Sequence, residues 1–150
     1  MESTLFKITN SLKYSGIFYG PMTTVYGFGI LALLLLNKHL LPKIKCNKIL
    51  KLIFEFIIFT ITLTLIEFIG GNVLKILFNI DMWDYSNKAF NIGKYVCLQL
   101  ALIWGFLGVL FINIFKPFTD KILSKITDKE TYLFLTIFII DLFLVLITKL

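Results

Sequence analysis

The sequence contains no arginine and only one histidine, His39, and its two cysteines, Cys46 and Cys97, are far apart. A structural zinc site takes four ligands, so one histidine and two isolated cysteines do not supply one within a single chain. The 150 residues also lack the G-x-x-x-x-G-K-[ST] phosphate-binding motif, which argues against an ATPase subunit. We therefore expect no metal and no cofactor.

All 15 basic residues are lysines, and they give the chain a net charge of +6. A charge of this size often indicates nucleic-acid binding, which requires the basic residues to gather on one face or in one run. Here the lysines are spread between apolar segments, where membrane topology already explains them. We expect the chain to have no nucleic acid partner.

Long apolar runs dominate the sequence, and 58% of its residues are hydrophobic. Four continuous runs reach the length of about 17–25 residues that a membrane-crossing helix needs. They cover residues 16–36, 52–69, 96–115 and 132–148. Continuous runs without alternation exclude barrel strands, so the sequence predicts an all-α membrane bundle of about four helices in one domain, 1–150. The first run is too long for a signal peptide core, and we expect it to be retained.

Two connecting segments are also predicted to be helical. Residues 73–80 have the composition of a short helix lying at the membrane interface. Residues 119–130 place Ile122, Leu123 and Ile126 on one helical face, which predicts a short amphipathic helix. The segment Gly70–Gly71 predicts a sharp turn at the end of the second span.

The lysines also predict an orientation. The two loops 37–51 and 116–131 together carry nine lysines, and the remaining segments carry six. The positive-inside rule places these two loops in the cytoplasm and both termini outside. Cys46 and Cys97 then lie on opposite sides of the membrane, so they should not form a disulfide bond within the chain.

Small residues recur in two of the predicted spans. Gly20 and Gly27 lie in the first span, and Gly105 and Gly108 lie in the third. Small residues allow helix backbones to approach closely, which favours helix-packing seams at these glycines. Pro21 can kink the first span, so a glycine-rich helix that lines a pore or groove is the alternative.

Three acidic residues lie inside the predicted spans. A carboxylate in lipid is costly, so each should face protein or water. Glu55 is predicted to pair with Lys51 or Lys48 at the end of its span. Asp141 lies in the middle of the last span, where a partner subunit, or Asn113 or Gln99 in the same chain, would satisfy it.

Glu67 has two interpretations, a substrate or proton site and a carboxylate satisfied within the bundle. The loop that follows carries Asp84 and Tyr85, and then Asn91 and Lys94. Trp83 and Tyr85 are also residues typical of the membrane interface. We predict that this loop folds back over the bundle and that Glu67, Asp84, Tyr85, Asn91 and Lys94 form one polar pocket, with Lys94 as counter-charge.

Two stretches of the sequence have an unusual composition. The first is G-I-F-Y-G-P-M-T-T-V-Y-G-F-G at residues 16–29. The second contains I-E-F-I-G-G at 66–71, W-D-Y-S at 83–86, N-I-G at 91–93 and W-G at 104–105. Together they resemble the ABC-transporter type IV (CmpB-like) family of bacterial membrane proteins. Thr24 stands where the family usually has proline and Lys94 where it has arginine, and the family's typical first helix has no counterpart in the 15 residues before Gly16.

The resemblance implies a permease-like subunit of a transport system in the bacterial cytoplasmic membrane. Four helices are few for a translocation path, so such a subunit would form a homo-oligomer or join other membrane subunits, together with a separate ATPase. Two other functions remain open. One is an intramembrane enzyme that acts on a lipid or lipid-linked substrate through Glu67 and Asp84. The other is a non-catalytic scaffold or regulator of a membrane complex.

Overall fold

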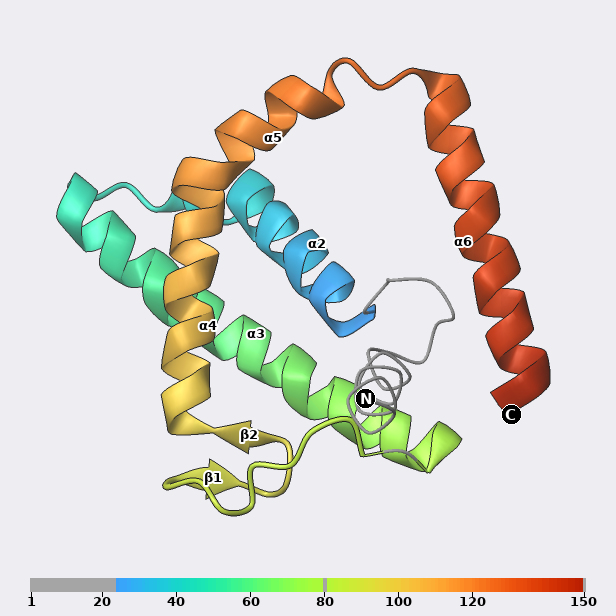
Figure 1. The fold of residues 1–150 in the computed structure, drawn as a ribbon. Helices are drawn as coiled ribbons and strands as arrows, with labels where there is room; N and C mark the ends of the chain where they lie inside the picture. The colour runs from blue at the N-terminus through green and yellow to red at the C-terminus, as the bar shows by residue number, and fades with distance from the viewer. Residues whose placement is uncertain (1–23, 80, 150) are drawn as a thin grey trace, which may run out of the picture.

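The computed structural model describes residues 24–79 and 81–149, and these residues are mainly helical (Figure 1). The elements run in the order α2 (Thr24–His39), η1 (Leu41–Lys43), α3 (Lys48–Phe78), β1 (Asn91–Ile92), β2 (Val96–Cys97), α4 (Leu98–Leu110), η2 (Phe111–Phe115), α5 (Lys116–Leu123) and α6 (Asp128–Lys149). Four helical segments among them are long and apolar enough to cross a membrane. The predicted all-α bundle of four membrane helices is confirmed.

The helix α3 is longer than the sequence predicted. It begins at the N-cap Asn47, whose side chain accepts a hydrogen bond from the Leu50 amide at 2.8 Å, and it ends at Asn79 in the left-handed conformation. The predicted turn at Gly70–Gly71 is wrong, and so is the separate interfacial helix at 73–80, because α3 continues through both as far as Phe78. At 1.5 Å per residue α3 is about 46 Å long, which exceeds the hydrocarbon thickness of about 30 Å.

Both glycines stay inside α3 because neighbouring segments pack against them. A Cβ on Gly71 would lie 2.5 Å from Cγ of Tyr95, and a Cβ on Gly70 would lie 3.1 Å from Cγ2 of Val25. These glycines therefore admit side chains from other segments and do not break the helix. The prediction of a turn was wrong because glycine also occurs inside membrane helices, where it allows close packing.

The third span bends where a π-helix interrupts it. The π-helical turn η2 ends at Phe115, two residues before Pro117. Proline has no amide hydrogen, and in a regular α-helix its ring would clash with the carbonyl four residues earlier, that of Asn113. The chain then continues as α5 and turns toward α6 (Figure 1). The predicted amphipathic helix at 119–130 is present in part: α5 ends at Leu123, and residues 128–130 belong to α6.

The most extensive helix contact in the described residues joins α3 and α4, which cross each other (Figure 1). Gly105 and Gly108 lie in this contact. A Cβ on Gly105 would lie 1.8 Å from Oγ1 of Thr60, and a Cβ on Gly108 would lie 3.2 Å from Cβ of Phe59. Phe59 is fully buried, in one cluster with Leu33, Leu41 and Ile112.

Gly27 is placed differently from Gly105 and Gly108, because a Cβ there would meet no atom within 4 Å. The predicted packing role of Gly27 therefore has no partner helix among the described residues, and Gly20 lies outside them. Among the described residues, α6 lies to one side of the other helices, and its Val145 packs in a cluster with Leu74 of α3 (Figure 1).

The contrast between Gly105 and Gly27 predicts a difference in stability. Gly105→Ala should destabilise the bundle by about 1–3 kcal/mol, as overpacking does, because the new methyl group overlaps the Thr60 side chain. Gly27→Ala has open space and should not destabilise it. Thermal unfolding in detergent measures both variants. Thr60→Ala should restore part of the loss in Gly105→Ala, and equal stability of the two alanine variants would contradict the packing.

Candidate functional site

Glu67 lies on α3 and is buried, with 7% of its surface exposed. Its Oε1 atom accepts two hydrogen bonds, from Nε1 of Trp104 at 3.3 Å and from the hydroxyl of Tyr85 at 3.4 Å. Trp104 belongs to α4, and Tyr85 belongs to the loop that precedes β1. The carboxylate is thus directed at protein, as its cost in lipid requires.

The other carboxylate oxygen of Glu67 is in a different position. Oε2 is buried and has no hydrogen-bond partner among the described residues, and the same is true of Oγ1 of Thr64, one helical turn earlier. A buried polar atom without a partner is uncommon and needs an explanation. Oε2 of Glu67 therefore still requires a hydrogen-bond donor or a proton that the described residues do not supply.

A second polar cluster lies in the loop between α3 and α4, and Asp81 is its centre. Asp81 Oδ1 accepts a hydrogen bond from the Tyr95 hydroxyl at 2.6 Å, while Oδ2 pairs with Nζ of Lys94 at 2.9 Å and Nζ of Lys75 at 3.1 Å. Lys94 also lies 3.6 Å from Oδ2 of Asp84. We call Lys75, Asp81, Asp84, Lys94 and Tyr95 the loop cluster.

In the loop cluster the pKa values of the two aspartates are lowered, and those of Lys94 and Tyr95 are raised. The Tyr95 hydroxyl and the two lysines hold the pKa of Asp81 well below its usual range. The bond to Asp81 in turn raises the pKa of Lys94 and that of Tyr95. The side chain and amide of Ser86 are the main reasons why the pKa of Asp84 is lowered.

A two-stranded hairpin forms part of the loop between α3 and α4. Strands β1 and β2 pair antiparallel, with Ile92 opposite Val96, and Gly93 between them has a φ of 64°, which glycine adopts readily. The Asn91 side chain donates to the Gly93 carbonyl at 2.9 Å, so Asn91 shapes the turn. The loop packs against α3, where the Tyr95 ring lies beside Gly71 and the Tyr85 hydroxyl reaches Glu67.

Tyr85 joins the two polar groups. Its backbone amide donates to the Lys94 carbonyl at 2.7 Å, and its hydroxyl reaches Glu67. Burial, followed by the neighbouring Glu67 carboxylate, raises the pKa of the Tyr85 phenol to about 12. The phenol therefore keeps its proton at neutral pH and acts as a donor.

The structure divides the five residues that the sequence grouped into one pocket. Glu67 and Tyr85 are bonded to each other, whereas Asp84 and Lys94 belong to the loop cluster and Asn91 to the hairpin turn. No hydrogen bond or ion pair joins Glu67 to Asp84 or Lys94 in the part of the chain that the structure describes. A pocket with Asp84 or Lys94 within hydrogen-bond or one-water reach of Glu67 stays a prediction, and the connection present among the described residues runs through Tyr85.

Sequence reasoning missed three of the partners. Asp81 and Tyr95 form the shortest bond of the loop cluster, and Trp104 bonds to Glu67 across 37 positions of sequence. Trp104 had one available signal, because a tryptophan in the middle of a span is away from the interface that this residue usually prefers. Asp81 and Tyr95 gave no comparable signal.

Glu55 also differs from the sequence prediction. It is buried at 3% exposure, and its Oε2 atom accepts a hydrogen bond from Nδ2 of Asn113 at 2.9 Å. The predicted pairs with Lys48 and Lys51 are absent among the described residues. Asn113 lies in the π-helical turn η2, so the bend before Pro117 coincides with the group that satisfies Glu55.

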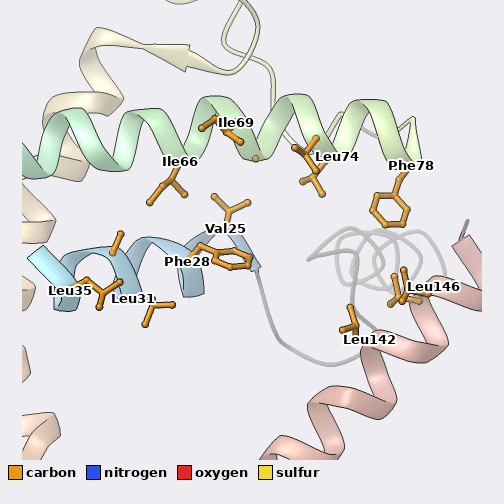
Figure 2. Close-up of a pocket in the computed structure, with 14 residues that line it drawn as sticks. Val25, Phe28, Leu31, Leu35, Ile66, Ile69, Leu74, Phe78, Leu142 and Leu146 are labelled. Atoms are coloured by element: carbon orange, nitrogen blue, oxygen red, sulfur yellow. The ribbon is translucent and has the colours of Figure 1, made fainter.

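Two cavities flank α3. The larger, about 600 Å³, lies between α2, α3 and α6, and the described residues that line it are all apolar, among them Val25, Ile66, Leu74 and Leu142 (Figure 2). The smaller, about 300 Å³, lies between α2, α3 and α4, and Glu67, Tyr26 and Trp104 are part of its wall. Glu67 is the only ionisable carboxylate that lines either cavity in the described part of the chain.

The loop cluster predicts an acid-sensitive fold. Because the folded state lowers the pKa of Asp81, its contribution is present above the ordinary aspartate value of 3.8 and is lost as the pH falls below it. Asp81→Asn should lower the melting temperature at neutral pH. In acid, the melting temperature of this variant should fall less than that of the wild type. Asp120→Asn, which breaks an exposed pair with Lys116, is the control and should change little. Identical acid profiles for wild type and Asp81→Asn would contradict the role of Asp81.

Comparison with known proteins gives one family. The family described as "Putative ABC-transporter type IV" matches residues 1–149, a longer part of the chain than the stretches between residues 16 and 105 that carry the resemblance. Searches of curated proteins and of solved structures gave no match. With four apolar helices long enough to cross a bilayer, the chain is a multi-pass membrane protein, and it belongs to the family described as "Putative ABC-transporter type IV".

Proposed function

We propose that this chain is a small membrane subunit of a transport assembly in the bacterial cytoplasmic membrane. The observation that carries the proposal is the burial of Glu55 and Glu67 within α3, a helix long enough to cross the bilayer, where they bond to Asn113 of η2 and Trp104 of α4. Ionisable side chains in the interior of a membrane bundle commonly mark substrate or ion pathways. The family to which the chain belongs supports the same function.

The chain would act together with other subunits. Its 150 residues contain no nucleotide-binding motif, so a separate ATPase would supply the energy. Four helices are few for a translocation path, which favours a homo-oligomer or association with other membrane subunits. The apolar cavity between α2, α3 and α6 supports the packing of further helices there (Figure 2).

The orientation follows the lysines. Loops 37–51 and 116–131 lie in the cytoplasm in this proposal, and both termini lie outside. The hairpin and the loop cluster, at the opposite end of α3 from Asn47, would then face the exterior. Tyr85 would connect the outer surface to the buried Glu67.

The enzyme alternative is less well supported than transport. It required Glu67 and Asp84 to act as an acid and base pair, whereas Asp84 is half exposed and bonds to Ser86 and Lys94. No observation favours the scaffold function over transport, and copurification separates the two.

Cysteine labelling tests the orientation. In intact cells an impermeant maleimide should label Ser86→Cys, which is exposed in the loop before β1, and should not label native Cys46. Cys97 is buried and should stay unlabelled in the wild type. Labelling of Cys46 in intact cells, together with protection of Ser86→Cys, would reverse the proposed orientation.

Copurification tests the assembly. The tagged full-length chain, extracted from its native membrane in mild detergent, should copurify in fixed proportion with an ATPase that carries the phosphate-binding motif. ATP hydrolysis by this complex should fall in Glu67→Gln and be unchanged in Glu130→Gln, where the altered carboxylate is exposed at the start of α6. A chain that purifies without an ATPase, and whose lipid-modifying activity depends on Glu67, would favour the enzyme.

A further inference from the structure

Among the described residues, the smaller cavity has an apolar wall with one acidic group, Glu67. Most of its lining is aliphatic or aromatic and comes from α2, α3 and α4. Ligand sites commonly have this composition, a mainly apolar pocket of about 300–1,000 Å³ with a few polar groups that fix the orientation of the ligand. The volume of about 300 Å³ corresponds to the smaller ligands in that range.

One of the two carboxylate oxygens of Glu67 has no hydrogen-bond partner among the described residues. Trp104 and Tyr85 both donate to Oε1 of Glu67, and they leave Oε2 without a partner among the described residues although it is buried. Trp104 and Tyr85 fix the position of the carboxylate, and Oε2 still requires a hydrogen-bond donor. The ion pairs of the described lysines all lie elsewhere, in the loop cluster and on α5.

Two aromatic rings make the same cavity suitable for a positive charge. Tyr26 and Trp104 both line it, and their ring centroids lie 5.5 Å apart. The faces of aromatic rings attract cations, and tryptophan does so most strongly. A carboxylate beside two aromatic rings is therefore suited to an ammonium group.

The cavity opens laterally toward the bilayer. Tyr26 and Ile30 on the α2 side are more than 40% exposed, and so are Leu107 and Phe115 on the opposite side. On a membrane helix such exposed apolar residues face lipid. A ligand with an apolar body could enter from the bilayer and keep that body against the aliphatic wall.

We propose that this cavity binds an amphiphilic ammonium compound, whose charged nitrogen pairs with the Glu67 carboxylate while its apolar body lies between α2 and α4. The aromatic rings of Tyr26 and Trp104 flank the charge. This site goes beyond the transport function and is independent of it, because it requires only the chain itself and a bilayer.

The test is binding of radiolabelled dodecylammonium to the full-length chain in phosphatidylcholine nanodiscs, with empty nanodiscs subtracted. Wild type should bind saturably, and dodecanoate and dodecanol should compete poorly because neither carries the positive charge. Glu67→Gln should weaken binding by about tenfold or more, as loss of a charged hydrogen bond does. Glu130→Gln, the same change outside the cavity, should bind like wild type.

A second variant covers the case in which Glu67→Gln does not fold. Ile30→Trp adds bulk at the exposed rim without altering Glu67, and it should reduce binding by obstructing the cavity. Unchanged binding in both variants would overturn the proposal, as would equal competition by dodecanoate. Absence of wild-type binding would also overturn the proposal. In that case, cross-linking between chains through cysteines introduced at Ile30 and Leu107 would assign the groove to a second copy of the chain.

Discussion

In a bilayer, apolar side chains gain little by leaving lipid for protein, so membrane helices associate through close packing and shared polar groups. The contact between α3 and α4 uses both. A Cβ on Gly105 would overlap Thr60 of α3, and a Cβ on Gly108 would contact Phe59 tightly. That close approach brings Trp104 within reach of Glu67. The position of the buried carboxylate thus depends on two glycines of the facing helix.

The loop between α3 and α4 extends this arrangement. Asp81 is bonded to Lys75, Lys94 and Tyr95, and the Tyr95 ring lies on the surface that Gly71 leaves open. The hairpin is thereby fixed to the end of α3. From this fixed loop the Tyr85 hydroxyl reaches down to Glu67, so the buried site and the exposed loop form one hydrogen-bonded structure.

The sequence predicted the number and nature of the spans because run length and apolar composition determine them directly. It also identified Glu67 and the loop after α3 as polar features. The partner of Glu67 could not be predicted, because Trp104 is 37 residues away and its approach depends on how two nearly uniform apolar helices are rotated. The extent of α3 was underestimated because Gly70 and Gly71 suit a turn as well as a packing surface.

The position of Glu67 is the central claim, since both the transport proposal and the ligand site require that its carboxylate faces protein within the bundle. Solid-state NMR of the isotope-labelled chain in lipid bilayers tests it through dipolar coupling between the Glu67 carboxyl carbon and the Trp104 indole nitrogen. The arrangement at 3.3 Å between Nε1 and Oε1 predicts a clear coupling that Trp104→Phe abolishes. The absence of that coupling, with the Glu67 carboxyl carbon instead in contact with lipid headgroups, would contradict the account.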